Sequence, residues 1–300
     1  MKKVLVTGGT VFVSRYVAGY YVRQGDEVYV LNRGTRPQSD GVIHINADRH
    51  ALGDVLRGYH FDVVIDVAAY NADDIHHLLD ALGSFDDYIF ISSSSVYPET
   101  LSQPFAEEQS IGENRIWGDY GLRKVEAEKA LKSRVPYAYI LRPPYLYGPM
   151  NNVYREAFVF DCAINDRPFY LPREGEMPLQ FFYIEDLCRF IDVLLDMHPE
   201  ETVYNVGNPD TVSVKEWVTL CYQAVGKEPS FVNVHNDGNV RDYFCFYDYA
   251  YTLDVQRQTN LMPHLTPLAK GLRKAYERYV AHPEEVNKKT LMAFIEENLK

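Results

Sequence analysis

The sequence predicts an α/β fold, a doubly wound parallel sheet with helices on both faces, and three observations support this prediction. Short apolar segments alternate with amphipathic segments through the first 150 residues. The apolar segments are nearly continuous, which is typical of parallel strands covered on both faces. The first of them runs directly into the glycine turn Thr7-Gly8-Gly9-Thr10, and a helical pattern follows. Strand, glycine turn and helix in this order begin a dinucleotide-binding βαβ unit.

The predicted elements follow one another through the first half of the chain. Runs such as DVVIDV (62–67) carry the β-branched residues that strands favour. The segments between them place apolar residues three and four positions apart, as amphipathic helices do. We expect strands over residues 3–7, 27–32, 42–46, 62–67, 88–92 and 137–141, and helices over 12–24, 73–82 and 120–133. In such a sheet, ligands bind outside the carboxyl ends of the strands.

The composition changes after Pro149, where the chain becomes richer in Pro, Asn and aromatic residues. We expect residues 1–150 to form a nucleotide-binding domain to which 181–200 return. Residues 151–300 would form a smaller, mixed α/β substrate-binding lobe. The helical patterns of this half lie at 154–165, 185–197, 214–225, 267–279 and 283–299.

Composition and charge restrict the class of protein. A hydrophobic content of 46% with 24% charged residues is ordinary for a globular protein. No apolar run approaches the roughly 20 residues that a membrane span needs, and no signal peptide is evident, so we expect a cytoplasmic protein. The net charge of −12 argues against general nucleic-acid binding. The four cysteines and nine histidines show no metal-ligand spacing, so no metal site is predicted.

A serine run and a Tyr-x-x-x-Lys spacing suggest acid–base chemistry. The serines at 92–95 follow a predicted strand, and Tyr120 and Lys124 lie one turn apart at the start of a predicted helix. An ammonium group beside a phenol favours the phenolate, so we expect Lys124 to lower the pKa of Tyr120 from about 10. Tyr120 then becomes a candidate general acid/base, and a serine hydroxyl could hold the same substrate oxygen. The spacing alone is weak, since about one such pair arises by chance in this composition; its weight comes from its placement.

Taken together, these segments resemble the extended short-chain dehydrogenases/reductases of the NAD-dependent epimerase/dehydratase type, and more narrowly a bacterial branch related to chloroplast stem-loop RNA-binding proteins. The resemblance covers nearly the whole chain. It implies a Rossmann-type NAD(P)-binding domain and oxidoreductase chemistry on a nucleotide sugar or a related hydroxylated small molecule. The segments that carry it are TGGTVFVS, LNRGTRP, NADR, DVAAY, SSSSVY, YGLRK, LRPPYLYGP, QFFYIEDL and YNVGN.

The resemblance also implies roles for individual residues. The catalytic set would be Ser93, Tyr120 and Lys124, with Ser94 a near alternative to Ser93 and with Lys124 also reaching the ribose of the cofactor. Apart from the resemblance, candidates for the substrate side are Ser94, Tyr97, Phe182 and Arg241. Arg241 could meet a substrate phosphate; the alternative is a surface arginine. The cofactor-binding residues would be Gly8, Gly9, Thr10, Val11, Phe12, Val13, Asn32, Arg33, Asp48, Arg49, Ala68, Ala69, Tyr70, Lys124 and Pro143.

The glycine turn departs from the pattern of this family. The family places glycines at positions that correspond to 8, 11 and 14, where this chain has Gly8, Val11 and Ser14. A Cβ at position 11 obstructs close approach of a pyrophosphate, and a side chain at position 14 loosens the contact between helix and strand. We expect dinucleotide binding to survive these changes.

The end of the second predicted strand bears on the choice of cofactor. Asn32-Arg33 stands where an NAD-preferring protein usually has an acidic residue for the ribose 2′-hydroxyl. With Arg36 nearby, Arg33 favours NADP over NAD, because a guanidinium pairs with a 2′-phosphate; the alternative is a solvated loop arginine.

Two classes of function stay open. The first is an enzyme, whether epimerase, dehydratase or reductase, and the second is a non-catalytic dinucleotide-binding or RNA-associated protein on the same fold. The partner we expect is a small-molecule substrate, with no membrane and no nucleic acid. A homodimer through the helices at 73–82 and 120–133 is plausible.

Overall fold

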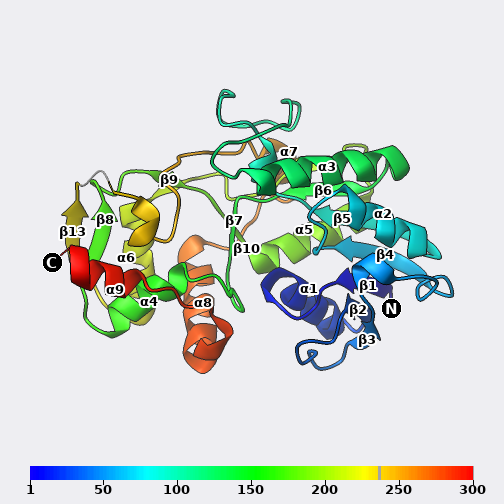
Figure 1. Cartoon of the computed structure of the whole chain (residues 1–300), viewed down its shortest axis with the longest axis horizontal. Helices are drawn as coiled ribbons and strands as arrows, with labels where there is room; N and C mark the ends of the chain where they lie inside the picture. Colours follow the sequence, from blue (N-terminus) through cyan, green and yellow to red (C-terminus); the bar gives the residue numbers. More distant parts are fainter. Residues whose placement is uncertain (236–237, 300) are drawn as a thin grey trace.

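The core of the molecule is a seven-stranded, all-parallel sheet in the order β11-β6-β5-β4-β1-β2-β3 (Figure 1). The computed structural model describes residues 1–235 and 238–299. The α/β fold class predicted from the sequence is confirmed. The strands are β1 (Lys3–Thr7), β2 (Glu27–Asn32), β3 (Ile43–Asn46), β4 (His60–Asp66), β5 (Ser84–Ile91), β6 (Tyr139–Arg142) and β11 (Val203–Asn205).

Helices cover both faces of this sheet (Figure 1). Helix α1 (Phe12–Arg23) contacts α5 (Ile184–Met197), and α2 (Ala72–Ala81) contacts α3 (Asp119–Arg134). Successive residues of β1 point into two separate cores, with Val4 in one and Leu5 in the other. Because β1 lies between β2 and β4, the chain order reverses beside it, and the crevice at this switch point is where such sheets bind ligands.

The second half of the chain supplies smaller elements grouped around β8 and β13, at the left of Figure 1. The pairs β7–β10 and β8–β13 are parallel, and β9–β12 is antiparallel. Two elements of this half join the first: α5 packs on α1, and β11 pairs with β6. The helices are α4 (Glu156–Ile164), α6 (Val214–Val225), α7 (Gln256–Leu261), α8 (Leu268–Ala281) and α9 (Leu291–Asn298). The strands are β7 (Tyr145–Tyr147), β8 (Phe169–Pro172), β9 (Pro178–Leu179), β10 (Phe181–Tyr183), β12 (Val212–Ser213) and β13 (Phe231–Val234).

The segment 283–299 differs from its prediction as one continuous helix. It forms a short 3₁₀ turn, η4 (Pro283–Glu285), an extended stretch, and then α9. The reason is a parallel bridge between Val153 and Asn287, in which the Asn287 amide donates to the Asn152 carbonyl at 2.9 Å. This amide is therefore not available to a helix. None of the helices within 1–235 and 238–299 is both long and apolar enough to cross a membrane.

Candidate cofactor and active site

Two adjoining cavities open at the carboxyl ends of β1, β2, β4 and β5. The larger, of about 630 Å³, contains Ser93 and Tyr120 and is called here the serine cavity. The smaller, of about 430 Å³, contains Asp48 and Arg49 and is called the arginine cavity. The two share Gly8, Arg33, Ala68 and Tyr70 in their walls. They therefore form one elongated groove at the switch point of the sheet.

The glycine turn between β1 and α1 forms the wall common to both cavities. Gly8 and Gly9 have φ angles of +92° and +87°, which glycine adopts without strain. A Cβ on Gly8 would lie 2.8 Å from Ser14 Oγ, and one on Gly9 would lie 2.6 Å from a methyl carbon of Val30. Ser14 thus occupies the space beside Gly8, and its hydroxyl donates to the Val11 carbonyl at 3.0 Å.

Residues 10–14, which include the first turn of α1, line the serine cavity. Unpaired backbone N–H groups and the helix dipole make such a helix start attractive to phosphate. Val11 stands at the N-cap position without a side-chain capping bond. Its side chain borders the cavity, where a third glycine would leave bare backbone. At Gly8 the cavity wall carries no side chain, and the N-terminus of α1 lies beside it. This arrangement fits the pyrophosphate of a dinucleotide.

Asn32 and Arg33, at the end of β2, have different roles. The Asn32 amide donates to the Gly8 carbonyl at 2.6 Å, and its oxygen accepts from the Gly34 amide at 2.9 Å. Asn32 therefore holds the glycine turn. Arg33 is exposed and contributes to both cavities.

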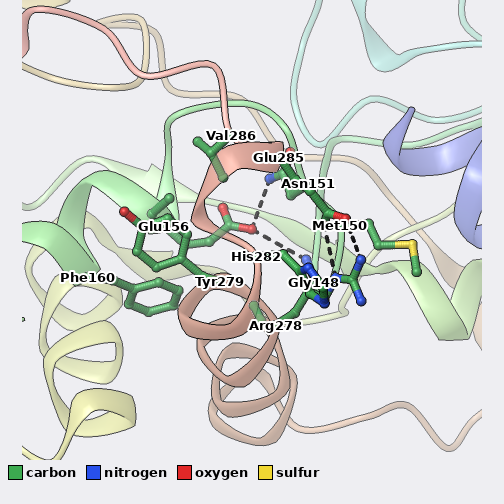
Figure 2. A pocket seen from close by; sticks show the side chains of 12 residues that line it. Gly148, Met150, Asn151, Glu156, Phe160, Arg278, Tyr279, His282, Glu285 and Val286 are labelled. Carbon is green, nitrogen blue, oxygen red and sulfur yellow. Dashed lines mark hydrogen bonds and ion pairs between the residues drawn. The ribbon is translucent and has the colours of Figure 1, made fainter. Parts of the chain in front are cut away.

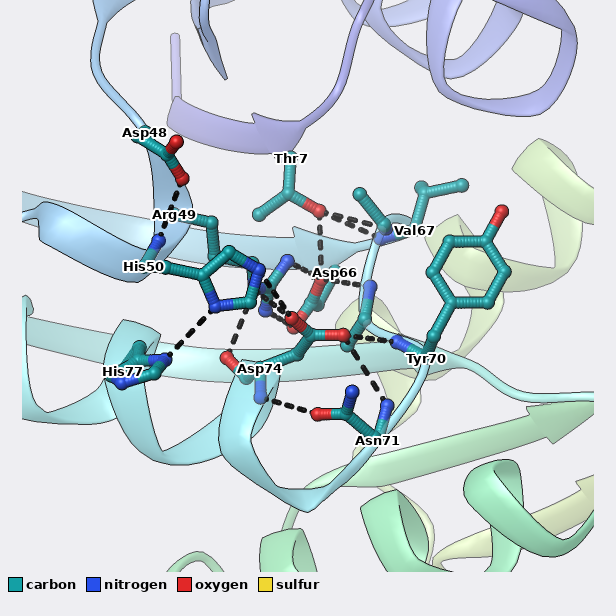
Figure 3. Close-up of polar contacts among 12 residues, drawn as sticks. Thr7, Asp48, Arg49, His50, Asp66, Val67, Tyr70, Asn71, Asp74 and His77 are labelled. Atoms are coloured by element: carbon teal, nitrogen blue, oxygen red, sulfur yellow. Dashed lines mark hydrogen bonds and ion pairs between the residues drawn. The ribbon is translucent and has the colours of Figure 1, made fainter. Parts of the chain in front are cut away.

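A buried ionic network underlies the arginine cavity (Figure 3). The fully buried Asp66 accepts hydrogen bonds from Thr7 Oγ1 and Tyr88 OH, each at 2.7 Å. Arg49 binds both carboxylate oxygens of Asp66, at 2.9 and 2.5 Å. Burial by itself would raise the pKa of Asp66, but the Arg49 guanidinium and these hydrogen bonds hold it below its ordinary value. This network ties β5 to the carboxyl ends of β1 and β4.

The same network fixes the loop after β4, residues 67–71. The Arg49 Nε donates to the Asp74 carbonyl at 2.9 Å, and the Asp74 carboxylate accepts from the Tyr70 amide at 2.8 Å (Figure 3). Asp48 is exposed, accepts from the His50 amide at 2.9 Å and lines the arginine cavity. No sequence motif marks Asp66 or Asp74 as part of this site. Asp66 is the second aspartate, after Asp62, in the otherwise apolar run 62–67.

The structure brings Ser93, Tyr120 and Lys124 to the wall of the serine cavity. Ser93 begins the 3₁₀ turn η2 (Ser94–Val96), and its hydroxyl accepts from the Ser95 amide at 3.2 Å. Tyr120 starts α3 and is 41% exposed, with its ring 6.2 Å from that of Tyr70. Lys124 is buried, and its ammonium donates to the Ala69 and Ile91 carbonyls at 2.7 and 2.9 Å.

The electrostatics of the Tyr120–Lys124 pair differ from the prediction. Burial lowers the pKa of Lys124 to about 8. The pKa of Tyr120 is raised, because protein displaces water from the phenol, and interaction with Ser93 and Arg155 only partly opposes this. The expected lowering of the Tyr120 pKa is therefore not found, and the Lys124 ammonium is directed at the two backbone carbonyls.

Several expected substrate contacts lie elsewhere. Tyr97 is fully buried; it accepts from Arg142 at 2.8 Å and donates to Asn205 at 2.8 Å. Arg142 in turn binds both oxygens of Glu128, at 3.0 and 2.6 Å. This second buried network supports β6 and does not line either cavity. Phe182 is also fully buried, in β10, and so is not among the cavity residues.

Ser94 and Arg241 both contact tyrosines of the second half of the chain. Ser94 is buried, and its hydroxyl donates to Tyr251 OH at 3.4 Å. The guanidinium of Arg241 lies 4.8 Å from the centre of the Tyr247 ring. Neither residue is in the wall of the serine cavity.

Arg155, which the sequence analysis did not single out, does reach the serine cavity. Its guanidinium lies 4.9 Å from the centre of the Tyr145 ring and 5.7 Å from that of Phe246. Within the part of the chain that the structure describes, it forms no ion pair. No periodicity or motif marks this arginine, because its position depends on the tertiary packing of the segment before α4, where it is the N-cap residue.

A buried carboxyl group next to Arg155 anchors the start of α4 (Figure 2). Glu156 Oε1 accepts from Asn151 Nδ2 at 2.9 Å and from the Gly148 amide at 3.4 Å. Burial raises the pKa of Glu156, and the Asn151 hydrogen bond partly offsets this. The carboxyl group joins the turn 148–151 to α4 and so helps to hold the neighbouring Arg155 at the cavity.

Solved structures of nucleotide-sugar epimerases and dehydratases share this fold. The UDP-glucose 4-epimerase from Thermotoga maritima, solved with UDP-glucose, has a TM-score of 0.75 and 18% identity, covering 94% of this chain and 99% of that one. The dTDP-glucose 4,6-dehydratase from Bacillus anthracis, in complex with NAD, has a TM-score of 0.73 and 18% identity, covering 95% and 99%. At such identities the likeness shows the fold alone.

Sequence comparison shows the family. The chloroplast stem-loop binding protein of 41 kDa b from Arabidopsis thaliana is 27% identical over 302 residues, which cover 92% of this chain and 78% of that protein. Residues 4–207 match the NAD dependent epimerase/dehydratase family, whose members are NAD-dependent enzymes of the oxidoreductase type. The resemblance stated from the sequence motifs is thereby confirmed. The chain belongs to the NAD dependent epimerase/dehydratase family.

Proposed function

We propose that this chain is an NAD(P)-dependent epimerase/dehydratase or reductase that acts on a nucleotide sugar or a related hydroxylated small molecule. The observation that carries the proposal is that the glycine turn, Ser93, Tyr120 and Lys124 line one cavity. Tyr120 moves a proton to or from the reacting oxygen, and Ser93 orients that oxygen by a hydrogen bond. The cofactor supplies the chemistry of hydride transfer.

The dinucleotide would lie along the groove formed by the two cavities. Residues 8–13 would hold the pyrophosphate at the start of α1, and Asp48 and Arg49 would border the adenosine. Ala68, Ala69 and Tyr70 would pass beneath the cofactor. Lys124 and Pro143 would lie at the nicotinamide end, with Lys124 exchanging one of its carbonyl contacts for a ribose hydroxyl.

We further propose that the cofactor is NADP rather than NAD. Asn32 is engaged by Gly8 and Gly34, which leaves the exposed Arg33 to meet the ribose of the adenosine. Replacing Arg33 by Gln should weaken NADPH binding about tenfold and leave NADH binding unchanged, since only NADPH carries the 2′-phosphate. Fluorescence titration of both nucleotides measures this. Tighter binding of NADH by the unaltered protein would refute the preference.

On the substrate side we propose that Arg241 binds a phosphate of the nucleotide sugar. It lies on an aromatic ring, 4.8 Å from the Tyr247 centroid, and no ion pair involves it among residues 1–235 and 238–299. Ser94 stays a neighbour of the site through Tyr251. UDP-glucose, the ligand of the similar Thermotoga epimerase, is the first compound to test.

The test of the enzymatic proposal combines cofactor binding with turnover. The purified protein is incubated with UDP-glucose and NADP or NAD, and products are analysed by NMR. Tyr120→Phe should reduce turnover about 10²- to 10⁴-fold, because it removes the proton that is transferred. Ser93→Ala should reduce it less, and both variants should still bind the cofactor. Full turnover by Tyr120→Phe would refute the role of the phenol.

A second candidate is a non-catalytic or RNA-associated protein, which the name of the Arabidopsis relative favours. The net charge of −12 opposes it. Retention of RNA in a salt-dependent manner, without binding of either nucleotide, would support this second candidate. A homodimer through the exposed faces of α2 and α3 is part of the first proposal and is tested by sedimentation.

A further inference from the structure

The C-terminal part of the chain contacts both halves of the molecule beside the serine cavity. Residues 283–290, called here the strap, lie between α8 and α9. Glu285 Oε1 accepts a hydrogen bond from Arg15 Nη1 at 2.7 Å, and Arg15 belongs to the first turn of α1, directly after the cavity residues 10–14. Two residues further on, the Asn287 amide donates to the carbonyl of Asn152, another cavity residue, at 2.9 Å. The strap therefore links the start of α1 to the segment before α4.

The second half of the chain holds the strap in place. Lys288 Nζ donates to Asp161 Oδ2 of α4 at 2.9 Å, and Arg278 Nε of α8 donates to Glu285 Oε2 at 2.9 Å. Glu285 also lines a small cavity together with residues of the turn 148–151 (Figure 2). The Glu285 carboxylate thus has a defined position, and through Arg15 it can restrain the other half of the molecule.

The start of α1 depends on contacts of this kind. Its N-cap residue, Val11, makes no side-chain capping bond. Phe12, the first residue of the helix, has a φ angle of +28°, which residues with a side chain rarely adopt. Such backbone strain persists only where the surrounding structure holds it. The Arg15–Glu285 pair can hold it, because the two side chains are only 30% and 17% exposed, so that water screens this pair less than a pair at the open surface.

We propose that Glu285 is a positioning residue for the dinucleotide, which acts through Arg15 and holds the first turn of α1 in the arrangement that binds the pyrophosphate. The proposal rests on the proposed function, since the ligand of that turn is the proposed cofactor. The same strap contacts Asn152, so it fixes two parts of the wall of the serine cavity relative to each other. The C-terminal segment thus contributes to nucleotide binding from outside the groove.

The sign of the effect separates positioning from simple electrostatics. Removing a negative charge near a phosphate site should tighten binding if only the charge matters. If Glu285 instead holds the helix start, Glu285→Gln should weaken binding about threefold, despite the lost negative charge. The measurement is fluorescence titration with NADPH and with NADH, compared for whichever nucleotide the unaltered protein binds more tightly. Tighter or unchanged binding by Glu285→Gln would overturn the proposal.

Further variants show whether Glu285 acts through Arg15. Arg15→Lys, which keeps the ion pair, should retain most of the affinity. The double variant Arg15→Gln/Glu285→Gln should bind no more weakly than Arg15→Gln alone, because both substitutions break the same contact. Arg167→Gln is the matched control, since its bridge to Glu296 of α9, at 2.6 Å, also ties the C-terminal segment but lies within the second half of the chain. It should leave binding unchanged. Additive losses in the double variant, or an equal loss in Arg167→Gln, would also overturn the proposal.

Hydrogen exchange measures the same restraint without any ligand. The amides of residues 10–20 and 284–290 are followed by mass spectrometry. In Glu285→Gln both segments should exchange faster than in the unaltered protein and in Arg167→Gln. Unchanged exchange of residues 10–20 would contradict the proposal even where the nucleotide binds. If the unaltered protein bound neither nucleotide while residues 10–20 exchanged faster in Glu285→Gln, the proposed function would be refuted and the restraint of α1 by Glu285 supported.

Discussion

In the arginine cavity the buried charges are paired with one another, whereas in the serine cavity the cations contact neutral carbonyls and aromatic rings. Asp66 is fully buried and is held by Arg49, Thr7 and Tyr88. Lys124 and Arg155, by contrast, contact backbone carbonyls and the faces of rings. Paired charges hold the wall of the arginine cavity in one arrangement. Cations without a carboxylate partner can exert an electrostatic attraction on groups bound in the serine cavity. One groove thus combines a stabilising end with a reactive end.

The strongest test of this contrast is Asp66→Asn. Removing the carboxylate leaves the buried Arg49 guanidinium with Asp74, 3.9 Å from its Nε, as its remaining counter-charge, so we expect a loss of about 3 kcal/mol in the free energy of unfolding. Urea denaturation measures the loss. Ser93→Ala, at the reactive end, is the control and should lose no more than about 1 kcal/mol, since it removes only the hydrogen bond from the Ser95 amide. Equal effects of the two substitutions would remove the distinction between the two ends.

The pH dependence of stability follows from the same carboxylate. The pKa of Asp66 in the folded state lies below its unfolded value, so its stabilising contribution is complete above about pH 4. It is lost as the pH falls through the folded pKa. The free energy of unfolding is measured from pH 5 downward. In Asp66→Asn, the part of its decrease that comes from protonation of Asp66 should be absent.

Lys124 should show the opposite sign. Its pKa of about 8 in the folded protein is lower than the ordinary value of about 10.5, so between these values the unfolded chain binds a proton that the folded chain does not. Stability should therefore gain about 3 kcal/mol from this group as the pH rises from 8 to 10.5. Tyrosines titrate in the same pH range. The difference between the unaltered protein and Lys124→Met separates the contribution of Lys124 from theirs. No difference in slope between the two would show that Lys124 is solvated.

From the sequence, the glycine turn of the groove could be predicted, but the buried network of Asp66 and Arg49 under the arginine cavity could not. Strand 3–7, its glycine turn and the helix after it follow from local residue preferences, so their positions were accurate. Asp66 and Arg49 meet only through the tertiary fold, and the apolar run around Asp66 concealed its role. Arg155 could not be found for the same reason, since it reaches the serine cavity from the segment just before α4, in the other half of the chain.

A smaller effect on stability is expected at Glu156, which anchors the start of α4 beside the serine cavity. Burial raises its pKa in the folded protein, so at neutral pH its charge opposes folding. Glu156→Gln keeps an oxygen that can accept from Asn151 and Gly148, and it should raise the free energy of unfolding at pH 7. At pH 4 the gain should shrink, because the carboxyl group of the folded protein is then protonated. A loss of stability at pH 7 would instead indicate that the charge itself is needed at the start of α4.

The smallest expected effect concerns Val11, where the groove departs from its family pattern. Val11 makes no side-chain capping bond to α1, and glycine is a better N-cap residue than valine, so Val11→Gly should leave the stability of the helix intact. It removes a side chain from the wall of the serine cavity and uncovers backbone N–H groups for the pyrophosphate, so NADPH binding should tighten about threefold. Ser14→Gly is the matched control, because Ser14 fills the space beside Gly8 and donates to the Val11 carbonyl. That variant should bind NADPH no more tightly and should lose about 1 kcal/mol of stability, since it places a glycine in a helix and removes a hydrogen bond. If Ser14→Gly tightened binding and Val11→Gly did not, the pyrophosphate would lie against the helix and not over the turn.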